Sequence, residues 1–69
     1  MILYKTPSCP MCKMLAQRLE KNNLSFEIID DVNTLIAKNI THVPVLEVDG
    51  QQMNLNEALQ WLREYERHD

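Results

Sequence analysis

Apolar side chains follow two different patterns along this chain of 69 residues, one with helical spacing and one of short continuous runs. From Pro10 to about Asn22 they recur at i, i+3, i+4 and i+7, which places them on one face of a helix. Short apolar runs bounded by Pro, Asn, Asp or Gly are typical of strands. The pattern predicts the order β-α-β-α-β-β-α, with strands over 1–5, 24–29, 43–48 and 51–53, and helices over 10–22, 32–38 and from residue 56 onward.

Polar residues indicate where the predicted helices begin and end. Asn23 and Asn39 follow the first two helices, and asparagine tolerates the left-handed backbone that ends a helix. Asn54 and Glu57 have the spacing of a capping box at the start of the last helix. The last residues, His68-Asp69, are expected to fray.

The predicted elements assemble into one α/β domain over residues 1–69. A crossover helix joins two parallel strands, and a hairpin turning at Asp49-Gly50 adds antiparallel neighbours. The result is a mixed four-stranded sheet with three helices distributed over both faces. Pro44 cannot donate a hydrogen bond inside a sheet, so it fits the start of the third strand, with a cis Val43-Pro44 bond.

Composition and charge exclude several classes of protein. Apolar residues make up 45% and charged residues 25%, as in ordinary globular proteins. The net charge is −3 and no cluster of Lys and Arg appears, so we expect no nucleic acid partner. The first apolar run is too short for a signal peptide, and none approaches the roughly 20 residues of a membrane span. We therefore expect a monomeric cytoplasmic protein that binds no membrane.

Cys9-Pro10-Met11-Cys12 connects the first strand to the first helix. The unpaired N–H groups of a helix N-terminus stabilise a thiolate at Cys9, and Pro10 suits the first helical position because it has no N–H. Cys12 lies one turn inward, close enough to form a disulfide with Cys9. In the reducing cytosol such a pair is more often catalytic than structural. The motif predicts a redox dithiol in which Cys9 is the nucleophile and Cys12 resolves the intermediate.

Metal binding is the main alternative for the cysteine pair. Structural zinc needs four ligands, and the chain offers only His42, His68 and carboxylates besides the cysteines. A copper chaperone loop usually has Met two residues before the first Cys, where this chain has Pro7. Two buried, inert cysteines are disfavoured because Cys9 lies at a strand-to-helix junction.

Four segments and the closing helix together resemble a known superfamily. The segments are Tyr4, Cys9-Pro10-Met11-Cys12, Thr41-His42-Val43-Pro44 and Val48-Asp49-Gly50. In this order and spacing they resemble the glutaredoxin and thioredoxin superfamily over nearly the whole chain, and small glutaredoxin-like proteins above all. The resemblance implies a minimal thioredoxin fold, thiol-disulfide oxidoreductase activity and a cis Pro44 facing the dithiol. It also implies that the backbone of Val43 pairs with an extended substrate beside Cys9, with Pro10 and the flexible Met11 as further contacts.

The chain departs from the glutathione-using members of this superfamily at two places. Those proteins have Lys or Arg three residues before the first Cys, where this chain has Thr6, with Lys5 one position away. Their Gly-Gly after the fourth strand falls on Asn54-Leu55. The departures favour hydroredoxin-like use of a thioredoxin-reductase-type flavoenzyme over glutathione as the reductant.

The predicted substrates are proteins with disulfides, and the resemblance adds ribonucleotide reductase as a candidate. No nucleotide or metal motif indicates an internal cofactor. Lys5 and Lys13 flank the motif and are candidates for raising its positive potential, and His42 is a candidate for lying beside the dithiol. The alternative class is a thioredoxin-fold adaptor or metal carrier that holds zinc, copper or an iron–sulfur cluster, although Pro10 would crowd a cluster.

Overall fold

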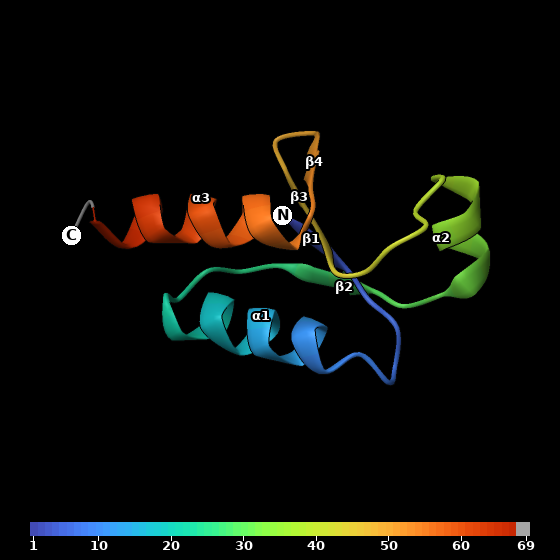
Figure 1. The fold of residues 1–69 in the computed structure, drawn as a ribbon, viewed down its shortest axis with the longest axis horizontal. Coiled ribbons are helices and arrows are strands. Elements are labelled where there is room, and N and C mark those ends of the chain that lie inside the picture. The colour runs from blue at the N-terminus through green and yellow to red at the C-terminus, as the bar shows by residue number, and fades with distance from the viewer. Residues whose placement is uncertain (68–69) are drawn as a thin grey trace.

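The computed structural model describes residues 1–67, so the fraying expected at His68-Asp69 lies outside the described part of the chain. The order of its elements is the predicted β-α-β-α-β-β-α (Figure 1). The elements are β1 (Ile2–Tyr4), α1 (Pro10–Lys21), β2 (Glu27–Ile29), α2 (Val32–Ala37), β3 (Val45–Val48), β4 (Gln51–Met53) and α3 (Leu55–Arg67).

The four strands form one mixed sheet in the order β2-β1-β3-β4. β1 runs parallel to β2 and antiparallel to β3, and β3 runs antiparallel to β4. Asp49 and Gly50 both have positive φ, 52° and 81°, as the tight hairpin turn between β3 and β4 requires. The arrangement is that of the expected minimal thioredoxin fold.

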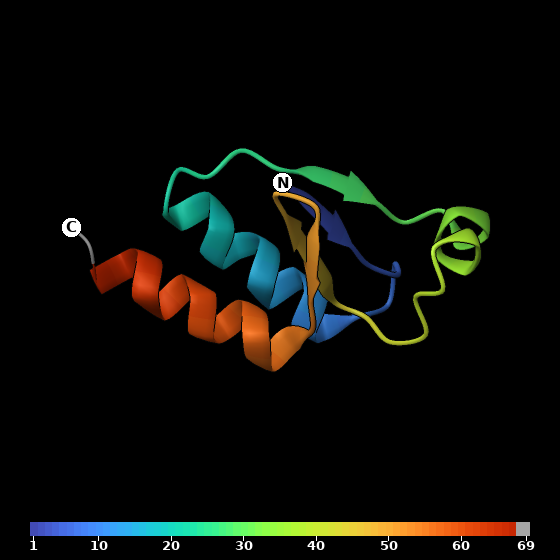
Figure 2. The same ribbon diagram turned by 90° about the horizontal axis from the view of Figure 1, so that it is seen from above.

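One face of the sheet carries the core. Leu3 lies opposite Leu46, and Leu46 lies opposite Met53, so the three side chains share a face. α1 and α3 lie side by side against this face (Figure 2). They contribute buried side chains at helical spacing, which are Leu15, Leu19, Ala58 and Leu62. Burying each leucine contributes roughly 1.5 to 3 kcal/mol, so this face dominates the stability of the domain.

The opposite face is covered only in part. α2 lies beyond the end of the sheet where β1 and β2 stop (Figures 1 and 2). Strand alternation turns Tyr4 away from Leu3, and the ammonium of Lys38, just after α2, lies 5.8 Å from the centre of the Tyr4 ring. The Tyr4 hydroxyl donates to Glu47 Oε1 at 3.1 Å, which satisfies a side chain with no exposed surface. The segment around α2 thus covers this face at Tyr4.

The predicted helix ends are confirmed by their backbone geometry. Asn23 and Asn39 have φ of 60° and 58°, the left-handed conformation expected of them. After α1, the N–H of Leu24 donates to the carbonyl of Leu19 at 3.1 Å, and the N–H of Asn23 to that of Glu20 at 3.0 Å. The same pair of hydrogen bonds follows α2, from Ile40 and Asn39. Both helices therefore end in a Schellman motif.

Three predicted strands are shorter than expected. The first spans Ile2–Tyr4 instead of residues 1–5, and the other two are shortened for local reasons. The strand predicted over 24–29 pairs only from Glu27, because Leu24 completes the end of α1. The strand predicted over 43–48 pairs only from Val45, because Pro44 has no N–H to donate.

The last helix begins at Leu55, one residue before the predicted start. Asn54 Oδ1 accepts the Glu57 N–H at 2.9 Å and Glu57 Oε1 accepts the Asn54 N–H at 3.0 Å, which confirms the capping box.

Candidate functional site

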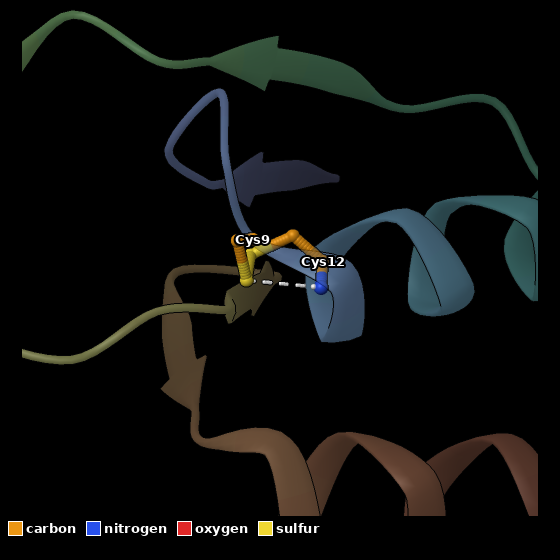
Figure 3. The surroundings of a disulfide bond; sticks show 2 residues. All are labelled: Cys9 and Cys12. Carbon is orange, nitrogen blue, oxygen red and sulfur yellow. Dashed lines mark hydrogen bonds between the residues drawn. A yellow bond between two sulfur atoms is a disulfide. The ribbon is translucent and has the colours of Figure 1, made fainter.

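The cysteine pair lies where the loop after β1 enters α1. Cys9 is the N-cap of α1, with extended backbone at φ −103° and ψ 105°, and Pro10 occupies the first helical position. The sulfur of Cys9 accepts the backbone N–H of Cys12 at 3.1 Å, drawn as the dashed line in Figure 3. A helix N-terminus thus directs one of its unpaired donors at this sulfur.

Cys9 and Cys12 form a disulfide, with their Cα atoms 5.3 Å apart. This separation lies within the usual range for disulfides, so the helix geometry itself brings the two sulfurs together. The two residues differ in exposure. Cys12 is fully buried in α1, whereas Cys9 is partly exposed at the tip of the helix. Of the two cysteines, only Cys9 has surface that a group in solvent can reach.

The Val43-Pro44 peptide bond is cis, as expected. Val45 pairs with Tyr4, so the residues just before Val45 lie at the end of β1 from which the dithiol loop departs. Figure 3 shows the start of β3 beside the disulfide. Pro44 itself is buried and Val43 is half-buried. The structure thus brings Val43-Pro44 to the same edge of the sheet as Cys9.

A hollow of about 470 Å³ opens beside Cys9, and we call it the Cys9 hollow. The loop before α1, the first turns of α1 and the strand β2 line it. Its lining residues are Lys5, Thr6, Pro7, Ser8, Cys9, Pro10, Lys13, Ala16 and Ile28. The sequence singled out Lys5, Lys13 and Pro10 separately, and the structure places all three around one cavity with Cys9.

His42 does not line the Cys9 hollow. It is exposed and lines a second hollow, of about 240 Å³, together with residues of β4 such as Gln52 and Met53. Neither cysteine lines this second hollow. Met11, in contrast, is 42% exposed next to the dithiol, where an apolar contact with a partner was expected.

Two residues that line the Cys9 hollow, Ala16 and Ile28, were not predicted as site residues from the sequence. From the sequence, Ile28 is expected only as a residue of the second strand and Ala16 as part of the apolar face of the first helix. In the structure both line the hollow, and Ile28 is 47% exposed. Ile28 lies opposite Leu3 in the parallel pair, so it is on the helix-covered face but at the outer strand. The sequence did not predict which strand lies at the outside of the sheet, so only the apolar character of Ile28 was available as a signal.

Comparison with known proteins agrees with this site. The sequence model of the Glutaredoxin family matches residues 1–53, a stretch that includes the dithiol, the cis proline and the whole sheet. The chain belongs to the glutaredoxin family. Family membership and the Cys9–Cys12 pair together indicate a thiol redox role. Searches of curated proteins and of solved structures returned no match.

Two further properties concern residues 1–67 alone. None of the helices in this range is both long enough and apolar enough to cross a membrane. The same residues contain no group of three or more His, Cys, Asp or Glu side chains placed to hold a metal ion.

Proposed function

We propose that this protein is a thiol-disulfide oxidoreductase that reduces disulfides in other proteins and is thereby an electron carrier. The observation that carries the proposal is the asymmetry of the dithiol. Cys9 is a partly exposed residue whose sulfur accepts the Cys12 N–H at the N-terminus of α1, whereas Cys12 has no exposed surface. Thiolate character and access are the two properties that a nucleophilic cysteine needs.

The reaction begins with both cysteines reduced. The Cys9 thiolate attacks one sulfur of the substrate disulfide, and the other substrate sulfur leaves and takes up a proton. Cys12 then loses its proton and attacks the sulfur of Cys9, which forms the Cys9–Cys12 disulfide and releases the second substrate thiol. The protein gives two electrons to the substrate, and in the disulfide that forms the two Cα atoms lie 5.3 Å apart, within the usual range for disulfides.

The substrate chain would lie along Val43-Pro44, at the sheet edge beside Cys9. Val43 is half-buried and lies two residues before the first paired residue of β3, and in this proposal its backbone would pair with an extended segment. Met11 and Pro10 are exposed next to Cys9 in the chain and would contact the same segment.

A thioredoxin-reductase-type flavoenzyme would return the two electrons. Position 6 is Thr, not a cation, and Asn54 is the N-cap of α3 with its side chain bound to the Glu57 N–H. A glutathione molecule would therefore lack both a charged contact at position 6 and an open backbone at position 54.

The trapping experiment tests the division of roles. Cys12→Ser cannot resolve the intermediate, so a peptide with a disulfide should remain attached to Cys9 and appear in the intact mass spectrum under non-reducing conditions. The matched variant Cys9→Ser should trap nothing. Stable attachment of the peptide to Cys12 in Cys9→Ser would contradict the proposal.

A further inference from the structure

The Cys9 hollow has features that thiol-disulfide exchange alone does not use. Its lining includes the apolar side chains of Ala16 and the 47% exposed Ile28. Lys5 and Lys13 also line it, and none of its lining residues is acidic. Within residues 1–67 the one ion pair joins Arg18 to Glu66, so both lysines of the hollow are without a carboxylate partner.

Lys13 lies near the N-terminus of α1, where the helix dipole disfavours a positive charge. Its N–H donates to the carbonyl of Cys9 at 3.3 Å, which places it at the end of the first turn of α1. A positive charge there is unfavourable because the helix N-terminus is itself positive, and no acidic residue in the first turn offsets it. The chain as a whole has a net charge of −3, so the hollow is a local positive site on an acidic protein.

We propose that the Cys9 hollow binds an acidic segment of the partner protein, next to the cysteine that Cys9 attacks. A carboxylate of that segment would lie between Lys5 and Lys13, and a neighbouring apolar side chain would cover Ala16 and Ile28. The volume of about 470 Å³ is that of a small-ligand site, so only a few side chains fit. The hollow thus selects disulfides that have Asp or Glu beside them.

This inference rests on the proposed function and names its substrate class. The test uses two synthetic peptides with the same intramolecular disulfide and the same flanking apolar residue. One peptide has two Glu residues beside a half-cystine, and the other has Gln at the same positions. Prereduced protein is mixed with each peptide, and the rate constant is measured by acid quench and chromatography. No reductase is needed.

The readout is the ratio of the two rate constants. At about 20 mM salt the protein should react about fivefold faster with the Glu peptide, as expected for exposed ion pairs. At about 0.5 M salt the ratio should fall toward one, because screening weakens exposed charge pairs. In the double variant Lys5→Gln, Lys13→Gln it should be close to one at either salt concentration, and Lys13→Glu should bring it below one. Lys21→Gln, at the other end of α1, is the matched control and should keep the fivefold ratio.

The experiment distinguishes failure of the docking proposal from failure of the proposed function. If the protein reduces both peptides equally fast, the hollow is not a docking site, although the proposed function stands. If the double variant slows both peptides alike and the ratio stays at five, the lysines act on Cys9 itself and the docking proposal is wrong. If the protein reduces neither peptide, the proposed function fails and this inference fails with it.

Discussion

The two sulfur atoms of the dithiol are three residues apart and have different surroundings. Cys9 caps α1 and accepts a backbone N–H, and Cys12 is enclosed by the helix and the sheet. The disulfide links a partly exposed cysteine to a fully buried one. In the reduced protein this difference should separate the reactivities of two chemically identical side chains.

Alkylation of the reduced protein measures this difference in reactivity between Cys9 and Cys12. At about pH 6, where an ordinary thiol is almost fully protonated, iodoacetamide should label Cys9 and leave Cys12 unlabelled. Peptide mass mapping after a short reaction identifies the labelled residue. Labelling of both cysteines in denaturant is the control for Cys12 reactivity. Preferential labelling of Cys12 in the folded protein would reverse the assigned roles.

Thr6 and Leu55 bear on the choice of reductant. Thr6 lines the Cys9 hollow, and Leu55 is the first residue of α3. Turnover of a disulfide substrate should be slower with glutathione and its reductase than with a thioredoxin reductase and NADPH. The double variant Thr6→Lys, Leu55→Gly should improve glutathione use by adding a charge-assisted contact of about 1 to 3 kcal/mol.

The control for that variant is Thr6→Gln, Leu55→Gly, which has a long side chain without the charge. It should leave glutathione use close to that of the wild type. Equal turnover of the wild-type protein with both reductant systems would show that glutathione binds without these two elements.

α1 and α3 are joined by an ion pair as well as by the core. Arg18 Nη2 lies 3.0 Å from Glu66 Oε1, and Asn22 Nδ2 donates to Glu66 Oε2 at 2.9 Å. The hydrogen bond from Arg18, and then that from Asn22, lower the pKa of Glu66 below its usual value. The same pairing raises the pKa of Arg18. Both side chains are about a third exposed (32% and 34%), so solvent screens the interaction and its contribution is small.

The lowered pKa of Glu66 predicts a pH dependence of stability. Its contribution is complete above the ordinary glutamate pKa of about 4.3 and is lost as the pH falls through the lower pKa of the folded state. The melting temperature of Glu66→Gln should therefore fall less between pH 6 and about pH 3 than that of the wild type. Glu64→Gln, on the same helix, should behave as the wild type does. Identical pH profiles of wild type and Glu66→Gln would show that the pair contributes nothing.

The whole molecule depends on one small core. For 69 residues a total stability of about 3 to 10 kcal/mol is typical, and here a single sheet face packed against two helices provides most of it. That core also holds α1, and therefore the dithiol, in place. A loss of core packing should affect the fold and the site together.

The variant Leu15→Ala measures how much one core side chain contributes to the free energy of unfolding. Leu15 is fully buried, so removing its side chain beyond Cβ should cost about 2 to 5 kcal/mol in urea unfolding of the oxidised protein. Ile36→Ala, at a side chain that is 67% exposed, should change stability by less than about 0.5 kcal/mol. A cost below about 1 kcal/mol at Leu15 would mean that the core repacks.

The sequence alone determined the features that depend on neighbouring residues. The order of elements, the Asn23 and Asn39 helix ends, the Asp49-Gly50 turn and the capping box follow from local backbone preferences and short-range hydrogen bonds, which a sequence displays directly. The spacing of Cys9 and Cys12 was likewise sufficient to predict a disulfide, because one helical turn fixes their separation.

The tertiary structure decided what depends on residues far apart in the chain. Pairing of β1 with β2 brings Ile28 to Lys5 and the first turns of α1, and so creates the Cys9 hollow. The path from α2 into β3 places His42 at a different hollow, although it is two residues from Pro44. Periodicity shows which side of an element is apolar but not which neighbour covers it. The exposure of Ile28 and the grouping of the two lysines therefore follow from strand order and helix packing, which are fixed only when the chain is folded.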